Sequence, residues 1–233
     1  MAGLQVCSVL VTGANQGIGL GLVRHFLGMP NPPKWVFAAC QDPKGQRAQG
    51  TSRHYGNTDL PCVGSAEVTD PASIKAAAAR VGEHLGGSGL NLLINNAGIM
   101  KLNSLDNETL EDMTQVYTTN TIGPLLLGQA FLPLLKKAAQ GSPSSALSCS
   151  KAAIINMSSS GGSIEEVYLW NYGQAAALNM LTKCQSLGYR QHGVLCVALH
   201  PGWVQTDMGG VSPWQVPQSP CADFPWEGRE LLP

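Results

Sequence analysis

The sequence predicts an α/β fold in which a doubly wound parallel sheet is covered by helices on both faces. Short, unbroken apolar runs recur along the chain, and this pattern is typical of strands that are buried on both faces. Helical patterns fall between the runs, so strands and helices alternate with right-handed crossovers. The runs that predict strands are residues 6–12, 35–40, 90–95, 152–157 and 194–199.

Helices are predicted over residues 18–27, 70–85, 109–137 and 172–189. The clearest boundary is at Asp70 and Pro71, an N-cap residue followed by proline at the first helical position, and glycines at 86 and 87 end that helix. In the long segment 109–137, Gly123-Pro124 predicts a bend.

Two regions fit the alternating pattern poorly. Residues 48–66 are polar and broken by glycine and proline, and only residues 61–68 offer a weak third strand. Beyond Met208 the chain is rich in proline and has little periodicity. We therefore predict a single domain over residues 1–210, followed by an irregular tail over residues 211–233.

The composition excludes several classes of protein. The 233 residues are 44% hydrophobic and only 12% charged, with a formal net charge of −1, so the basic surface of a nucleic-acid or anionic-membrane binder is absent. No apolar run approaches the ~18 residues of a membrane span. The seven cysteines form no C-x-x-C pair and the histidines are scattered, so we predict no metal site and a cytoplasmic location.

A glycine-rich segment, TGANQGIG, follows the first predicted strand and opens the first helix. Glycines there allow a tight turn and let backbone N–H groups approach a pyrophosphate at the helix N-terminus. The position between strand and helix predicts a dinucleotide-binding site. Three residues separate the first two glycines, as in T-G-x-x-x-G-x-G rather than G-x-G-x-x-G.

These motifs resemble the short-chain dehydrogenases/reductases, NAD(P)-dependent oxidoreductases built on a single Rossmann domain. The resemblance continues through NNAG at 95–98, INMSS at 155–159 and PGWVQTDM at 201–208. The last motif is most similar to the sniffer/C-factor type of carbonyl reductase. The family normally continues with a covering helix and a last strand, and the proline-rich tail predicts that this strand is missing.

The residue after the second strand bears on the choice of cofactor. A basic residue there meets the 2′-phosphate of NADP, whereas an acidic residue binds the ribose hydroxyls of NAD. Gln41 occupies the position where the sniffer-like pattern has arginine, and Asp42, Lys44 and Arg47 follow it. The resemblance favours NADP(H) over NAD(H), while Gln41 leaves NAD(H) open.

The resemblance also implies a set of cofactor-binding residues along the carboxyl ends of the strands. They are Gly13, Asn15, Gln16, Gly17, Ile18 and Gly19 in the phosphate loop, Gln41, Glu67 and Val68 near the adenosine, Asn95, Ala97 and Gly98 on the ribose side, and Pro201, Gly202, Val204 and Thr206 facing the nicotinamide.

Hydride transfer to a carbonyl leaves an alkoxide that needs a proton and hydrogen bonds. By resemblance, Ser159 holds the carbonyl oxygen, Tyr172 donates the proton, and Asn120 organises the long helix and a bound water. The family also has a lysine four residues after the tyrosine, which lowers the pKa of the phenol and grips the nicotinamide ribose.

That lysine is absent in either possible register. Matching AALN at 176–179 to the family places Asn171 at the tyrosine position and Ala175 at the lysine position; a shift by one residue gives Tyr172 and Ala176. Lys183 lies about 16 Å further along the helix. Lys101, after the NNAG motif, is the one lysine we consider as a substitute.

The sequence therefore favours an NADP(H)-dependent reductase of aldehydes or ketones, impaired by loss of the lysine. The alternative is an inactive dinucleotide-binding protein that acts as a sensor or assembly partner. We expect a small carbonyl substrate and no nucleic-acid or membrane partner. By analogy, a homodimer would form through the helices at 109–137 and 172–189.

Overall fold

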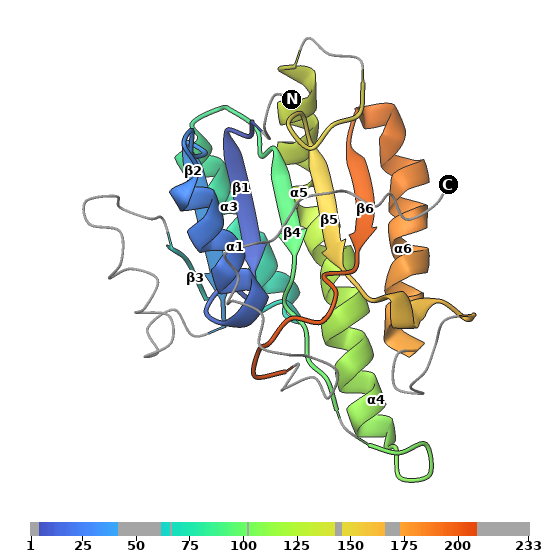
Figure 1. Cartoon of the computed structure of the whole chain (residues 1–233). Coiled ribbons are helices and arrows are strands. Elements are labelled where there is room, and N and C mark those ends of the chain that lie inside the picture. The colour runs from blue at the N-terminus through green and yellow to red at the C-terminus, as the bar shows by residue number, and fades with distance from the viewer. Residues whose placement is uncertain are drawn as a thin grey trace.

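The computed structural model describes residues 5–41, 62–65, 67–101, 103–142, 146–165 and 173–208. Six parallel strands form one sheet in the order β3-β2-β1-β4-β5-β6 (Figure 1). The chain therefore moves outward from β1 to β3 and then returns to the centre at β4, which confirms the doubly wound parallel sheet. The strands are β1 (Ser8–Thr12), β2 (Trp35–Cys40), β3 (Cys62–Ser65), β4 (Leu92–Asn95), β5 (Ala153–Met157) and β6 (Leu195–Leu199).

All five apolar runs contain strands. The predicted second strand has the observed bounds, and the other four strands start one or two residues later than the runs. The first residue of each of these four runs is buried although it lies outside the strand. The weak third strand also forms, as β3, and its register against β2 shifts between Ala38 and Cys40. The polar stretch from 42 to 61 and the predicted tail lie outside the described residues.

Within the described residues, the α-helices are α1 (Gly17–Gly28), α3 (Pro71–Leu85), α4 (Leu110–Tyr117), α5 (Gly123–Gln140) and α6 (Gly173–Tyr189). The predicted cap of α3 is confirmed, since the Asp70 carboxylate accepts from the backbone N–H groups of Ala72 at 3.0 Å and Ser73 at 3.1 Å. Gly86, at φ +54°, ends the helix in the left-handed conformation.

The bend predicted at Gly123-Pro124 stays a prediction, but the helix is irregular just before that point. The helical path continues from α4 into α5 through a π-helical turn at Thr118–Ile122, just before Gly123. The N–H of Gly123 bonds to the carbonyl of Thr118, five residues back, and Pro124 follows without an N–H of its own. Because this bond spans five residues instead of the four of an α-helix, the turn before Gly123 is wider than an α-helical turn.

The two faces of the sheet carry separate apolar clusters, which explains why its strands are apolar throughout. On one face Val9 and Val11 pack with Val23 and Phe26 of α1. On the other, alternate strand residues pack against α3 and α5; this cluster includes Leu10, Phe37, Leu93, Ile74, Val81, Leu127, Phe131 and Leu135. The described part of the chain holds no helix long and apolar enough to span a membrane.

Candidate active site

The predicted site residues gather at one edge of the sheet. The glycine loop follows β1, Gln41 follows β2, Glu67 comes soon after β3, and the segments at 95–98, 158–159 and 201–206 follow β4, β5 and β6. Because all strands are parallel, their carboxyl ends meet at this edge, where ligands of open α/β sheets bind. The lower half of Figure 1 shows these loops together.

The glycine loop is packed so tightly at Gly13 and Gly19 that neither position has room for a side chain. Gly13 has φ +64°, and a Cβ there would lie 2.8 Å from the Cα of Ala97. A Cβ on Gly19 would collide with the backbone oxygen of Gly13 and lie 2.6 Å from Nδ2 of Asn96. The loop therefore presents backbone to whatever occupies the edge, and α1 begins there at Gly17.

Two residues that the sequence prediction did not assign hold this loop in place. The Oγ1 of Thr12 accepts from the backbone N–H groups of Asn96 and Ala97, both at 3.0 Å, and Nδ2 of Asn96 donates to the carbonyl of Thr12 at 2.9 Å. Thr12 is the first residue of the TGANQGIG motif and Asn96 the second residue of the NNAG motif, so membership in these motifs could have indicated them. They fasten the loop after β1 to the loop after β4.

The last motif reaches over the same loop. A Cβ on Gly17, at φ +51°, would lie 3.4 Å from Cγ2 of Thr206, so the segment after β6 covers the start of α1. Among the residues predicted for the ribose side, Asn95 is buried: its side chain is 3% exposed and donates to Oδ1 of Asn156 at 2.8 Å. Its assignment to the ribose stays a prediction.

Asn120 lies in the π-helical turn and fastens the loop after β4 to it. Its Oδ1 accepts from the N–H of Ile99 at 2.9 Å, and its Nδ2 donates to the carbonyl of Ile99 at 2.8 Å. A Cβ on Gly98 would lie 3.3 Å from the same Oδ1. Both ends of the amide are thus used to position backbone beside the glycine loop.

Ser159 lies just after β5 and caps a short 3₁₀ turn, Ser160–Gly162, where its Oγ accepts from the N–H of Gly161 at 3.0 Å. The turn packs directly on α6, since a Cβ on Gly162 would lie 2.6 Å from the backbone of Ala175. The structure therefore brings Ser159 next to the first turn of α6. Asn171 and Tyr172 lie outside the described residues.

A family model described as short chain dehydrogenase matches residues 8–215, which include the whole sheet and all the loops at its carboxyl edge. The chain belongs to the short-chain dehydrogenase family.

Solved structures of carbonyl reductases resemble this short-chain dehydrogenase. The NADPH-bound carbonyl reductase from chicken fatty liver is 66% identical, with a TM-score of 0.87 over 91% of this chain and 81% of that one. Carbonyl reductase Sniffer of D. melanogaster is 35% identical, with a TM-score of 0.82 over 88% of this chain and 84% of that one. Estradiol 17-beta-dehydrogenase 2 of Mus musculus is 32% identical over 87% of this chain, which spans only 49% of that relative.

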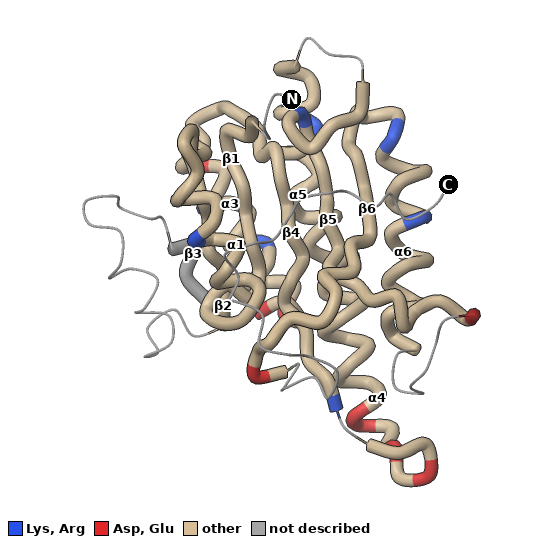
Figure 2. Tube along the Cα trace, in the orientation of Figure 1, with Lys and Arg blue, Asp and Glu red and all other residues tan. Residues whose placement is uncertain are grey.

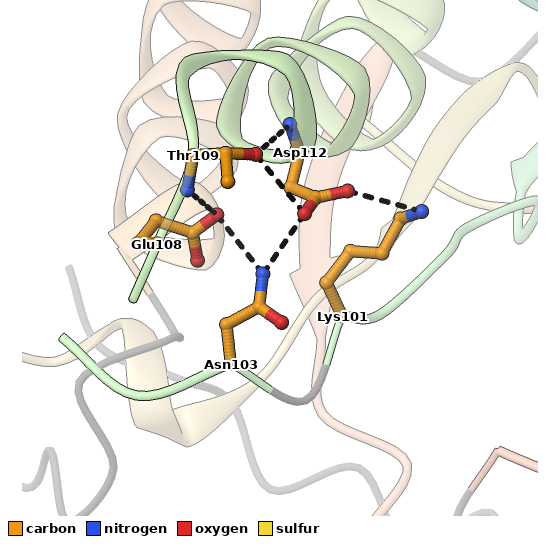
Figure 3. Close-up of polar contacts among 5 residues, drawn as sticks. All are labelled: Lys101, Asn103, Glu108, Thr109 and Asp112. Carbon is orange, nitrogen blue, oxygen red and sulfur yellow. Dashed lines mark hydrogen bonds and ion pairs between the residues drawn. The ribbon is translucent and has the colours of Figure 1, made fainter. Parts of the chain in front are cut away.

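Lys101, the predicted substitute for the missing lysine, is engaged elsewhere in this short-chain dehydrogenase. Its Nζ lies 3.2 Å from Oδ1 of Asp112 in α4, and Oδ2 of Asp112 accepts from Nδ2 of Asn103 and from Oγ1 of Thr109, each at 3.0 Å (Figure 3). Hydrogen bonds from Asn103, Lys101 and Thr109 hold the pKa of Asp112 below its ordinary value of 3.8. Figure 2 shows further acidic residues at the start of α4 and on the loop before it.

A small pocket lies beside this ion pair, between the loop after β4, α4 and the start of α6. Apolar residues of α4 form one wall and the first residues of α6 form another. The lining residues are Lys101, Glu108, Met113, Val116, Tyr117, Gly173 and Gln174. The pocket thus extends from the Lys101–Asp112 ion pair to Gly173, the first residue of α6.

Proposed function

We propose that this short-chain dehydrogenase is a carbonyl reductase that transfers a hydride from NADPH to an aldehyde or ketone. The observation that supports the proposal most is its 66% identity, over 91% of its length, to a carbonyl reductase whose structure contains NADPH. We place the nucleotide at the glycine loop, which the amide of Asn96 and the hydroxyl of Thr12 hold from behind.

The residues at the carboxyl edge fit a dinucleotide. Gly13 and Gly19 leave no room for a Cβ, so backbone N–H groups at the start of α1 would hold the pyrophosphate. Thr206, whose Cγ2 would lie 3.4 Å from a Cβ on Gly17, would lie toward the nicotinamide end. The nucleotide, when bound, supplies the hydride.

The chain's own residues then orient the carbonyl group and supply the proton. Ser159 would donate a hydrogen bond to the carbonyl oxygen, and Tyr172 would donate the proton as a neutral phenol. An ordinary tyrosine has a pKa near 10, so without a neighbouring cation it stays a neutral phenol at neutral pH and exchanges protons poorly there. General acid–base help is worth about 10²–10⁴-fold, and we expect much of it to be lost.

The test is carbonyl-dependent oxidation of NADPH by the purified chain, with aromatic aldehydes and diketones as substrates. We expect slow turnover that Tyr172→Phe abolishes while NADPH binding persists. Nucleotide binding with no turnover above background would exclude the reductase. Failure of both NADPH and NADH to bind would exclude any dinucleotide function.

A second candidate is a dinucleotide-binding protein without catalysis. Two observations favour it: Ala175 and Ala176 occupy both possible lysine positions, and the ammonium group of Lys101 is paired with Asp112. Such a protein would be stabilised by NADPH against thermal unfolding in the absence of any carbonyl turnover.

A further inference from the structure

We propose that Asn179 of α6 is a positioning residue for Ser159, because it fastens the loop after β5 to the helix that begins directly after position 172. The contact that carries the proposal is a hydrogen bond beside Ser159. Oγ of its neighbour Ser158 donates to Oδ1 of Asn179 at 2.6 Å. This inference rests on the proposed function, since it concerns the carbonyl end of the same site.

Ser158 is held between the sheet and α6. Its N–H donates to the carbonyl of Leu199, at the end of β6, at 2.8 Å. On the other side its Oγ donates to Asn179, and the carbonyl of Ala175 lies 3.5 Å from the same Oγ. Of the two acceptors on α6, Asn179 is much the nearer. The residue before Ser159 therefore has a fixed place relative to both elements.

The turn that follows Ser159 contacts the same amide. A Cβ on Gly162 would lie 2.7 Å from Nδ2 of Asn179, so this side chain lies against the turn as well as against Ser158. Within the turn, Oγ of Ser159 accepts from the N–H of Gly161 at 3.0 Å. A hydroxyl that accepts one hydrogen bond can still donate its own proton. The bond from Gly161 thus limits the directions in which Ser159 can donate.

The place of Ser159 along α6 matters because Ser159 and the proton donor must reach the same carbonyl oxygen. α6 begins at Gly173, so the helix that carries Asn179 follows the proposed donor directly. A misplacement of about 1 Å can lower a rate by about 10²-fold. The loss should appear in kcat, because the hydrogen bond to the oxygen strengthens as negative charge develops there.

The experiment compares carbonyl-dependent oxidation of NADPH by the wild-type chain, Asn179→Leu and Asn91→Leu. Asn91 is a matched control, since it is also a partly buried asparagine but lies at the opposite edge of the sheet. There its Oδ1 accepts from the N–H of Ser8 at 3.1 Å, and its Nδ2 donates to the carbonyl of Lys151 at 2.8 Å. We expect Asn179→Leu to lower kcat by about 10- to 100-fold without changing the dissociation constant of NADPH. Asn91→Leu should lose stability but keep its kcat.

A double-mutant cycle tests whether Asn179 acts through Ser158. Ser158→Ala removes the same hydrogen bond from the other side, so we expect the double variant Ser158→Ala/Asn179→Leu to lose no more of kcat than Asn179→Leu alone. Ser158→Ala is also the smaller change, so it keeps the test available if Asn179→Leu does not fold.

A measurement without substrate follows the turn itself. We expect amide hydrogen exchange over residues 158–163, measured by mass spectrometry, to become faster in Asn179→Leu and to stay unchanged in Asn91→Leu. Unchanged exchange in Asn179→Leu, equal losses of kcat in the two asparagine variants, or additive losses in the cycle overturn this inference. If the wild-type chain shows no carbonyl-dependent turnover, the proposed function itself fails, and this inference fails with it.

Discussion

The side chains of Asn95 and Asn156 are joined across the middle of the sheet, where β4 and β5 are in register and Nδ2 of Asn95 donates to Oδ1 of Asn156 at 2.8 Å. Asn156 in turn donates to Oγ1 of Thr182 at 2.8 Å and to Oε1 of Gln185 at 2.9 Å, both on α6. All four side chains are buried. The network therefore connects the carboxyl end of the sheet to the helix that follows position 172.

The first prediction concerns the stability provided by this network. Asn156→Leu would leave the Asn95 amide and the Gln185 carbonyl buried without this partner, and we expect it to lower the free energy of unfolding by about 3–5 kcal/mol. Gln185→Met should cost less, about 1–2 kcal/mol, because Nε2 of Gln185 already has no partner among the described residues. Urea denaturation gives both values. Equal losses for the two variants would contradict the role given to Asn156.

The second prediction concerns the missing lysine. If Tyr172 is the proton donor, Ala176→Lys places an ammonium group one helical turn away, and we expect kcat/KM for carbonyl reduction to rise by about 10²-fold. If position 171 is the donor position, only the double variant Asn171→Tyr/Ala175→Lys should gain activity. Steady-state rates of NADPH oxidation decide between the registers. No gain in either variant would favour the non-catalytic candidate.

The third prediction uses the pH dependence of the ion pair on α4. The pKa of Asp112 is lowered in the folded chain, so its carboxylate stabilises the fold above its unfolded pKa and loses this effect as the pH falls through the folded value. We expect Asp112→Asn to lower the melting temperature near neutral pH. The difference from the wild-type chain should shrink as the pH falls below 3.8 and vanish once the carboxylate is protonated in the folded chain as well. A difference that persists in acid would assign the effect to packing.

Much of the fold could be predicted because its signals are local. Residues such as Phe37 and Leu93 lie in unbroken apolar runs since helices bury both faces of the sheet. Asp70 predicts the start of α3 because a helix cap needs only the following three residues. The glycine pattern predicts the tight packing of this loop, since only glycine at positions 13 and 19 lets the neighbouring backbone come so close.

Contacts between distant side chains could not be predicted in this way. The Lys101–Asp112 pair joins a loop to a helix, and nothing in the local sequence distinguishes this lysine from one free to act in catalysis. The Gln41–Glu67 bond depends on β3, whose weak pattern gave little information about its register.

The last prediction compares two glycines at opposite ends of α1. A Cβ on Gly19 would collide with the Gly13 carbonyl and lie 2.6 Å from the amide of Asn96, whereas a Cβ on Gly28 would meet nothing within 4 Å. We expect Gly19→Ala to weaken NADPH binding more than ten-fold and to cost about 1–3 kcal/mol of stability through overpacking. Gly28→Ala should change the stability by less than about 1 kcal/mol and leave binding intact. Fluorescence titration and urea denaturation of the two variants measure both effects. Because the glycine loop forms the pyrophosphate site in this proposal, a Gly19→Ala variant that binds NADPH as the wild-type chain does would show that the nucleotide does not approach this backbone.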